Sequence, residues 1–99
     1  MCGIVGYIGE KPVYDVLING LKKLEYRGYD SSGIMIYNKS SLVKKSIGKV
    51  SALESLFDNY KDKKGTIGIG HTRWATHGPP NQVNSHPHVS NSGEISLVH

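Results

Sequence analysis

The amino-acid sequence predicts one small domain that mixes α-helices with β-strands, of either the α/β or the α+β class. Residues 13–24 carry apolar side chains at the i, i+3, i+4 spacing of a helix, whereas residues 2–8, 34–37 and 66–72 are rich in strand-forming residues and glycine. A chain of 99 residues can bury one hydrophobic core. We therefore expect a single folded unit over residues 1–99.

The first third of the chain is predicted to form a strand followed by a helix. Cys2 to Ile8 combines glycine with branched and aromatic residues, which is typical of a strand whose backbone is closely approached by another segment. Cys2 then stands at the end of this strand. Pro12 suits the first turn of the helix. One buried stripe is expected on the helix, formed by Val13, Val16, Leu17, Gly20, Leu21 and Leu24.

A hairpin is predicted in the middle of the chain. Tyr26 to Gly33 has the composition of a loop and precedes the strand-forming residues 34–37. Residues 38–41 favour a turn, after which residues 42–47 return as the second strand.

A second helix and a further strand are predicted next. Ser51 and Glu54 have the spacing of a capping box ahead of an amphipathic stretch. Residues 66–72 form the glycine-rich strand, and a long polar loop is expected from Arg73 to about Gly93. In the last segment, alternate residues from 95 to 97 would share one face of a strand.

Composition and charge exclude several classes of function. The net charge of +4 comes largely from lysine clusters within 22–23, 44–45 and 61–64, without interleaved aromatic residues, so solvated surface lysines explain it better than nucleic-acid binding. No apolar run approaches the roughly 20 residues of a membrane span. The opening residues lack the pattern of a secretory signal. We therefore expect a cytoplasmic protein that binds neither membrane nor nucleic acid.

Cys2 is the only cysteine, so it is a structural thiol, a metal ligand or a nucleophile. Removal of Met1 would leave a free α-amino group on the residue that carries the thiol. Such an amine titrates at about 7.7 to 8.0, so it can take a proton from the nucleophile near neutral pH and return it to a leaving group. Nucleophile and base would then belong to one residue. From position alone, a small buried residue at a strand start is the more common role.

Polar side chains gather in residues 70–78, after a predicted strand. Arg73 offers a planar fork that matches a carboxylate in two hydrogen bonds, and Thr76 and His77 add polar groups within the same loop. An amino-acid substrate would suit this fork. The alternative is a surface loop that Trp74 anchors in the core. Arg27, in the earlier glycine-containing loop, is a weaker candidate, because such an arginine more often braces backbone carbonyl groups.

The five histidines suggest a zinc site, but only weakly. His86 and His88 would share one face of an extended segment. No HExxH or CxxC motif is present. Further ligands would have to be gathered from distant His71, His77, His99 or Cys2.

Three motifs together carry a family resemblance. They are MCGIVG at residues 1–6, LEYRGYDS at 24–31 and HTRWATHG at 71–78. The first resembles the start of the class II glutamine amidotransferases, which are N-terminal nucleophile hydrolases, and the other two are similar to the glucosamine-6-phosphate synthase branch. The resemblance covers nearly the whole chain, including VNSHPH at 83–88. Amidophosphoribosyltransferases, with a different second motif and arginine loop, are the distant alternative.

The resemblance implies that the thiolate of Cys2 attacks the side-chain amide of glutamine and releases ammonia. A glutamyl thioester remains, and water releases glutamate from it. In complete enzymes of this branch, a sugar isomerase domain uses the ammonia to convert fructose 6-phosphate to glucosamine 6-phosphate. No metal or organic cofactor is implied, and the complete enzyme is expected to be a homo-oligomer.

The resemblance also implies roles for five further side chains. Arg73 would bind the glutamine carboxylate, and Thr76 and His77 would complete the pocket. Trp74 would lie at its mouth, and Arg27 would support the loop around the nucleophile. A rival hypothesis is a non-catalytic module in which the two arginines bind a carboxylate or phosphate and the cysteine is structural.

The fold implied by the resemblance is an α+β sandwich in which two β-sheets face each other between helical layers. Residues 1–99 would be its N-terminal part, without the sugar isomerase domains. The family's Asn-Gly pair, which stabilises the oxyanion, would follow His99, as would the aspartate that holds the substrate amine. Loss of one oxyanion donor typically costs about 100- to 1,000-fold in rate. The chain alone is therefore expected to be nearly inactive.

Overall fold

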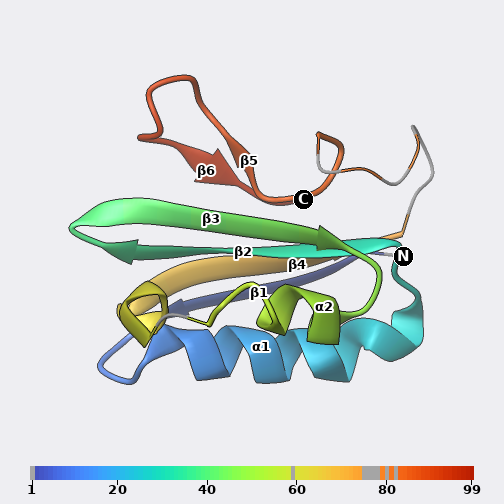
Figure 1. Cartoon of the computed structure of the whole chain (residues 1–99), viewed down its shortest axis with the longest axis horizontal. Coiled ribbons are helices and arrows are strands. Elements are labelled where there is room, and N and C mark those ends of the chain that lie inside the picture. Colours follow the sequence, from blue (N-terminus) through green and yellow to red (C-terminus); the bar gives the residue numbers. More distant parts are fainter. Residues whose placement is uncertain (1, 59, 75–78, 80, 82) are drawn as a thin grey trace.

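The chain folds into a small α+β domain built on a four-stranded antiparallel sheet (Figure 1). The computed structural model describes residues 2–58, 60–74, 79, 81 and 83–99, apart from the side chains of Arg27 and Tyr60. The strands are β1 (Gly3–Ile8), β2 (Ser31–Asn38), β3 (Ser40–Ile47) and β4 (Ile67–Arg73), in the order β1-β4-β2-β3. Every neighbouring pair in this sheet is antiparallel, which decides between the two predicted fold classes.

Helices α1 (Val13–Leu24) and α2 (Val50–Glu54) cover one face of the sheet (Figure 1). The predicted position of α1 is confirmed, but its buried stripe is rotated: Tyr14 and Ile18 are buried, whereas Val16 and Leu24 are only partly buried. For Tyr14 the reason is a contact outside the helix, since its ring packs at 4.9 Å from the ring of Phe57. The core consists of Val13, Tyr14, Leu17, Ile18, Leu21, Ile34, Ile36, Val50, Leu53 and Phe57.

The second helix differs from its prediction. α2 begins at Val50, with Lys49 as its N-cap and no side-chain capping bond, so the predicted capping box of Ser51 and Glu54 is wrong. Val50 and Leu53 are fully buried, and their packing sets the start of the helix earlier than its polar residues suggest. The chain then turns through the short 3-10 helix η2 (Tyr60–Lys63) instead of continuing as one long helix.

The turn regions are also more structured than predicted. Lys39 alone joins β2 to β3, in a left-handed backbone conformation with φ of 68°. The predicted long loop contains a strand, β5 (His88–Val89), which pairs with β6 (Ser96–Leu97). This small hairpin lies over the sheet face opposite the helices (Figure 1). The 3-10 helix η1 (Glu25–Arg27) follows α1.

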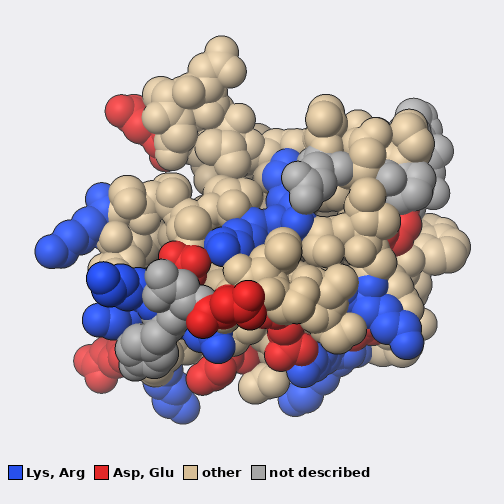
Figure 2. All heavy atoms as spheres, viewed as in Figure 1, with Lys and Arg blue, Asp and Glu red and all other residues tan. Residues whose placement is uncertain are grey.

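Charged side chains of both signs are interspersed over the helical layer (Figure 2). Two cross-element ion pairs contribute to this pattern, Lys22 with Glu54 at 2.7 Å and Lys44 with Asp62 at 3.2 Å. The exposed lysines at 22, 23, 61 and 64 fit the interpretation as solvated surface residues. Lys45 does not, because it is partly buried and its Nζ donates to the carbonyl oxygen of Ser85 at 2.9 Å. None of the described helices is long and apolar enough to cross a membrane.

Candidate active site

Three strands have neighbouring ends at one end of the sheet: β1 and β2 begin there, and β4 ends there. This arrangement brings two of the predicted motifs together. Gly3 of β1 pairs with Thr72 of β4, so the next position outward sets Cys2 across from Arg73. On its other side, Arg73 pairs with Ser31, the first residue of β2. Side chains alternate along a strand, and Val5 and Tyr7 pack against the helical core. Cys2 and Arg73 therefore both belong to the opposite face of the sheet, away from the helices.

A cavity of about 430 Å³ lies at this end of the sheet. It is large enough for a small-molecule ligand. Its polar and aromatic lining comes from Cys2, Arg73, Trp74, Asn84, His86, His88 and His99. Cys2 is half-buried, and its thiol is not in a disulfide. The predicted nucleophile and the predicted carboxylate receptor thus share one cavity, although 71 positions separate them in the sequence.

Arg73 is held firmly at the end of β4. Its side chain is only 8% exposed, and Nη1 donates to Oδ1 of Asp30 and to the carbonyl oxygen of Pro79, both at 3.4 Å. Asn84 donates to the same Pro79 carbonyl at 2.9 Å. These contacts tie the guanidinium to the segment that forms the far wall of the cavity.

Trp74 lies at the cavity but not in the core. Half of its surface is exposed, so the alternative in which it anchors the loop in the core is wrong. Its ring packs against Gly28, where a Cβ atom would come within 2.8 Å of the ring and where φ is +99°. The loop that carries Arg27 is therefore adjacent to Trp74, although only the backbone of Arg27 is described. Thr76 and His77 lie outside the described residues, and their predicted roles stay predictions.

A cluster of histidines, His71, His86, His88 and His99, forms the part of the site that was not predicted as such. The ring of His86 stacks on His71 at 4.1 Å and also lies 4.2 Å from His88 and 4.7 Å from His99. Sequence reasoning considered these residues only as metal ligands. The VNSHPH segment of the family resemblance was the signal that could have directed attention to them.

His86 stacks on His71, is tilted against His88 and meets the ring of His99 edge-on. No group of three or more His, Cys, Asp or Glu side chains within the described residues is arranged to hold a metal ion. Nε2 of His71 hydrogen-bonds the backbone oxygen of His99 at 2.6 Å, which further ties this cluster to the backbone. The arrangement is that of a packing layer between β4 and the chain around β5.

Burial makes three members of the cluster, His71, His86 and His88, hard to protonate. It lowers the pKa of His86 to about 4, helped by the neighbouring His71, His88, His99 and Arg73. The pKa values of His71 and His88 are also lowered, in both cases chiefly by burial. Near neutral pH His71, His86 and His88 are therefore uncharged, and their rings can pack together without repulsion.

The docking of this cluster is expected to weaken on acidification. The folded pKa of His86 is about 4 and the ordinary histidine value is 6.5, so between these values the unfolded chain binds the extra proton. Its contribution to stability is complete above pH 6.5 and is lost as the pH falls toward 4, by at most about 3 kcal/mol for His86. Native-state hydrogen exchange at His88 and Val89, corrected for the intrinsic effect of pH, should show protection falling from pH 7 to 5. This range lies above ordinary carboxyl pKa values. Constant protection would contradict the lowered pKa of His86. In His86→Asn, protection should depend less on pH than in wild type.

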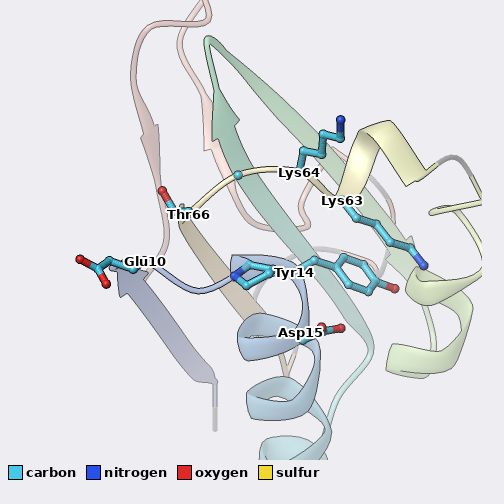
Figure 3. A pocket seen from close by; sticks show the side chains of 8 residues that line it. Glu10, Tyr14, Asp15, Lys63, Lys64 and Thr66 are labelled. Atoms are coloured by element: carbon cyan, nitrogen blue, oxygen red, sulfur yellow. The ribbon is translucent and has the colours of Figure 1, made fainter.

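A second cavity, of about 290 Å³, lies at the opposite end of β4. Lys63 runs beside Tyr14 there, with Nζ 4.9 Å from the ring centre, whereas Glu10 points away from both (Figure 3). The lining combines two carboxylates with two lysines: Glu10, Asp15, Lys63 and Lys64. A lining with both charges favours neither an anionic nor a cationic ligand. The predicted site residues lie at the other end of the strand.

Comparison with known proteins agrees with the motifs. No protein-family model matches the chain. Curated proteins named glutamine–fructose-6-phosphate aminotransferase (isomerizing) do match it: the chain is 57% identical to that of Bacteroides thetaiotaomicron, 56% to that of Caldanaerobacter subterraneus and 53% to that of Pyrococcus horikoshii. Each match includes the whole chain but only 16% to 17% of the relative.

Because the matches include the whole chain, they include every segment that builds the site. The chain spans about one sixth of the length of these relatives. Over that span, its sequence is similar to that of the glutamine–fructose-6-phosphate aminotransferases (isomerizing).

Proposed function

We propose that this chain is part of a glutaminase domain that hydrolyses glutamine with Cys2 as an N-terminal nucleophile. The observation that carries the proposal is the shared cavity of Cys2 and Arg73, which combines a thiol with a buried guanidinium. The ammonia would serve the synthesis of glucosamine 6-phosphate from fructose 6-phosphate, in keeping with the names of the relatives.

The chemistry requires Met1 to be removed, so that Cys2 carries a free α-amino group. That amine takes the thiol proton as the sulfur attacks the amide carbon of glutamine, and it then delivers the proton to the departing ammonia. A thioester between Cys2 and the glutamyl group remains. Water, deprotonated by the same amine, adds to the thioester carbon and releases glutamate and the regenerated thiol.

Arg73 supports this proposal by its charge and burial. A guanidinium at the wall of the cavity can pair with the α-carboxylate of glutamine in two hydrogen bonds, and low exposure strengthens such a pair. Trp74, half-exposed at the same cavity, would cover its mouth. Thr76, His77 and Arg27 keep their proposed roles in the pocket and in the loop around the nucleophile.

The complete fold we propose is the αββα sandwich of the N-terminal nucleophile hydrolases. Its support is the uneven burial of the four-stranded sheet, whose helical face is packed while Ile4, Ile8 and Ile67 on the other face are 52%, 81% and 38% exposed. An apolar sheet face of this kind is normally covered. A second sheet would cover it, and separate domains of the complete protein would carry the sugar chemistry.

Release of glutamate from glutamine by the complete protein tests the proposal. An amidophosphoribosyltransferase would also release glutamate, but its ammonia would not appear in glucosamine 6-phosphate when fructose 6-phosphate is supplied. A binding module would show neither reaction. Mass spectrometry of the N-terminus separates this last case further, because a retained Met1 would block the α-amino base.

Arg73→Lys in the complete protein is expected to raise KM for glutamine about 10-fold or more, with a smaller change in kcat. The lysine keeps the charge but loses the two-pronged geometry, and the carboxylate lies away from the bond that breaks. Steady-state glutaminase kinetics measure both constants.

The matched control is Arg27→Lys, the same exchange at the residue proposed to support the loop. It should leave KM for glutamine nearly unchanged. A fall in kcat at constant KM in Arg73→Lys would contradict the assignment of Arg73 to the carboxylate.

A further inference from the structure

The carboxylate of Asp30 lies behind Arg73, outside the set of residues that line the cavity. Its Oδ1 accepts a hydrogen bond from Nη1 of Arg73 at 3.4 Å and another from the hydroxyl of Ser31 at 3.0 Å. Asp30 is 16% exposed in its side chain, and Arg73 is 8% exposed. The pair is thus largely shielded from water and couples two different strand ends.

The backbone of Asp30 is as tightly held as its side chain. Its N–H donates to the carbonyl oxygen of Arg73 at 2.6 Å, and its own carbonyl oxygen accepts from the N–H of Gly48 at 2.9 Å. Asp30 is therefore fixed to β4 on one side and to the end of β3 on the other. A carboxylate on such a rigid support can hold a partner in a defined position.

Asp30 is also incompletely satisfied. Among the described residues its Oδ2 atom is buried and has no hydrogen-bond partner. A buried acceptor of this kind typically costs about 1 to 3 kcal/mol. The charge of Arg73 offsets part of the free-energy cost of burying this carboxylate. The stability of Asp30 in this place therefore depends on the position of the guanidinium.

The length of the contact matters for function. A charge-assisted N–H to carboxylate bond is usually about 2.7 to 2.9 Å long. At 3.4 Å, the bond from Arg73 to Asp30 is longer than this, and Arg73 itself lines the cavity. Asp30 thus contacts a guanidinium that lines the cavity without lining the cavity itself.

We propose that Asp30 is a positioning residue that orients the guanidinium of Arg73 toward the α-carboxylate of the amino-acid substrate, an inference that rests on the proposed glutaminase function. Asp30 does not touch the substrate in this arrangement. It acts through Arg73, by fixing Nη1 and by partly balancing the buried charge before the substrate arrives.

The test compares Asp30→Asn with wild type in the complete protein, because asparagine keeps the shape of the side chain but loses its charge. KM for glutamine should rise about 10-fold, with kcat within about 2-fold. With 4-aminobutanamide, which is glutamine without its carboxylate, kcat/KM should change little. Asp30→Glu, which restores the charge, should recover part of the affinity for glutamine.

Two controls separate positioning from a general structural effect. Asp15→Asn makes the same exchange on the exposed side of α1 and should leave all these constants unchanged. Adding Asp30→Asn to Arg73→Lys should raise KM by less than about 2-fold further, because residues that act through one contact are not additive.

An unchanged KM for glutamine in Asp30→Asn would overturn the inference. Equal losses of kcat/KM with glutamine and with 4-aminobutanamide would also overturn it, because they would indicate structural damage. Failure of the glutaminase proposal is distinguishable, since wild-type protein would then release no glutamate from glutamine in the first place.

Discussion

Replacement of Cys2 by serine is expected to reduce glutamine hydrolysis by the complete protein about 1,000-fold or more. Serine is nearly isosteric with cysteine, but its hydroxyl is far harder to ionise than a thiol, so the same α-amine cannot activate it. Cys2 is half-buried at the cavity and forms no disulfide, so the fold should be nearly unchanged. Glutamate release is the measurement, with circular dichroism as a check on folding.

Two observations complete the test of Cys2. Mass spectrometry should show that Met1 is removed equally from wild type and Cys2→Ser, so that the variant differs only in its nucleophile. A glutamine analogue with an electrophile at the amide position should label wild-type Cys2, as peptide mapping can verify. A serine variant that keeps most of the activity, or a label on another residue, would rule out Cys2 as the nucleophile.

Gly33→Ala is expected to destabilise the docking of residues 85–99 on the sheet by about 3 kcal/mol and to reduce glutaminase activity with it. Gly33 is buried in β2, and a Cβ atom there would overlap the carbonyl oxygen of His86. The obstacle is backbone, which cannot rotate away like a side chain. The wall of the cavity that contains Asn84, His86 and His88 would have to shift.

The matched control is Gly6→Ala on the same open face of the sheet. The nearest atom to its added Cβ is Cγ2 of Ile69 at 4.0 Å, an ordinary contact distance. Hydrogen exchange at His88 and Val89 in the complete protein measures local docking, and glutamate release measures the site. If Gly33→Ala matches Gly6→Ala in both, the chain around His86 does not pack on β2.

Local patterns predicted the elements well where packing and propensity agree. The helix at residues 13–24 and the strands around 34–37, 42–47 and 67–72 are all found, because alternation and helical periodicity already encode their buried faces. The errors occur where a long-range contact overrides a local signal. Contact with Phe57 buries Tyr14 outside the predicted stripe of α1, and the burial of Val50 displaces the capping box.

The candidate site was predictable in its parts. Cys2 is marked by its position in the chain, and Arg73 by its motif, so both were named from the sequence. Asp30 was not named, and His86 was named only as a possible metal ligand, because an aspartate in a turn and a histidine in a polar loop carry no local sign of their partners. Their partners become apparent only when distant segments of the chain pair, as in the bond from Arg73 to Asp30 and the stack of His71 on His86.

The amino-acid sequence by itself therefore determined the family resemblance, the proposed nucleophile and the order of helices and strands, because these depend on residue identity and short-range periodicity. The tertiary structure alone decided that Cys2 and Arg73 share a cavity, that Asp30 lies behind the guanidinium and that His86 stacks on His71. These features depend on the antiparallel register of β1, β2 and β4, which joins residues far apart in the chain. Periodicity specifies which face a side chain occupies, but only strand pairing specifies its neighbours.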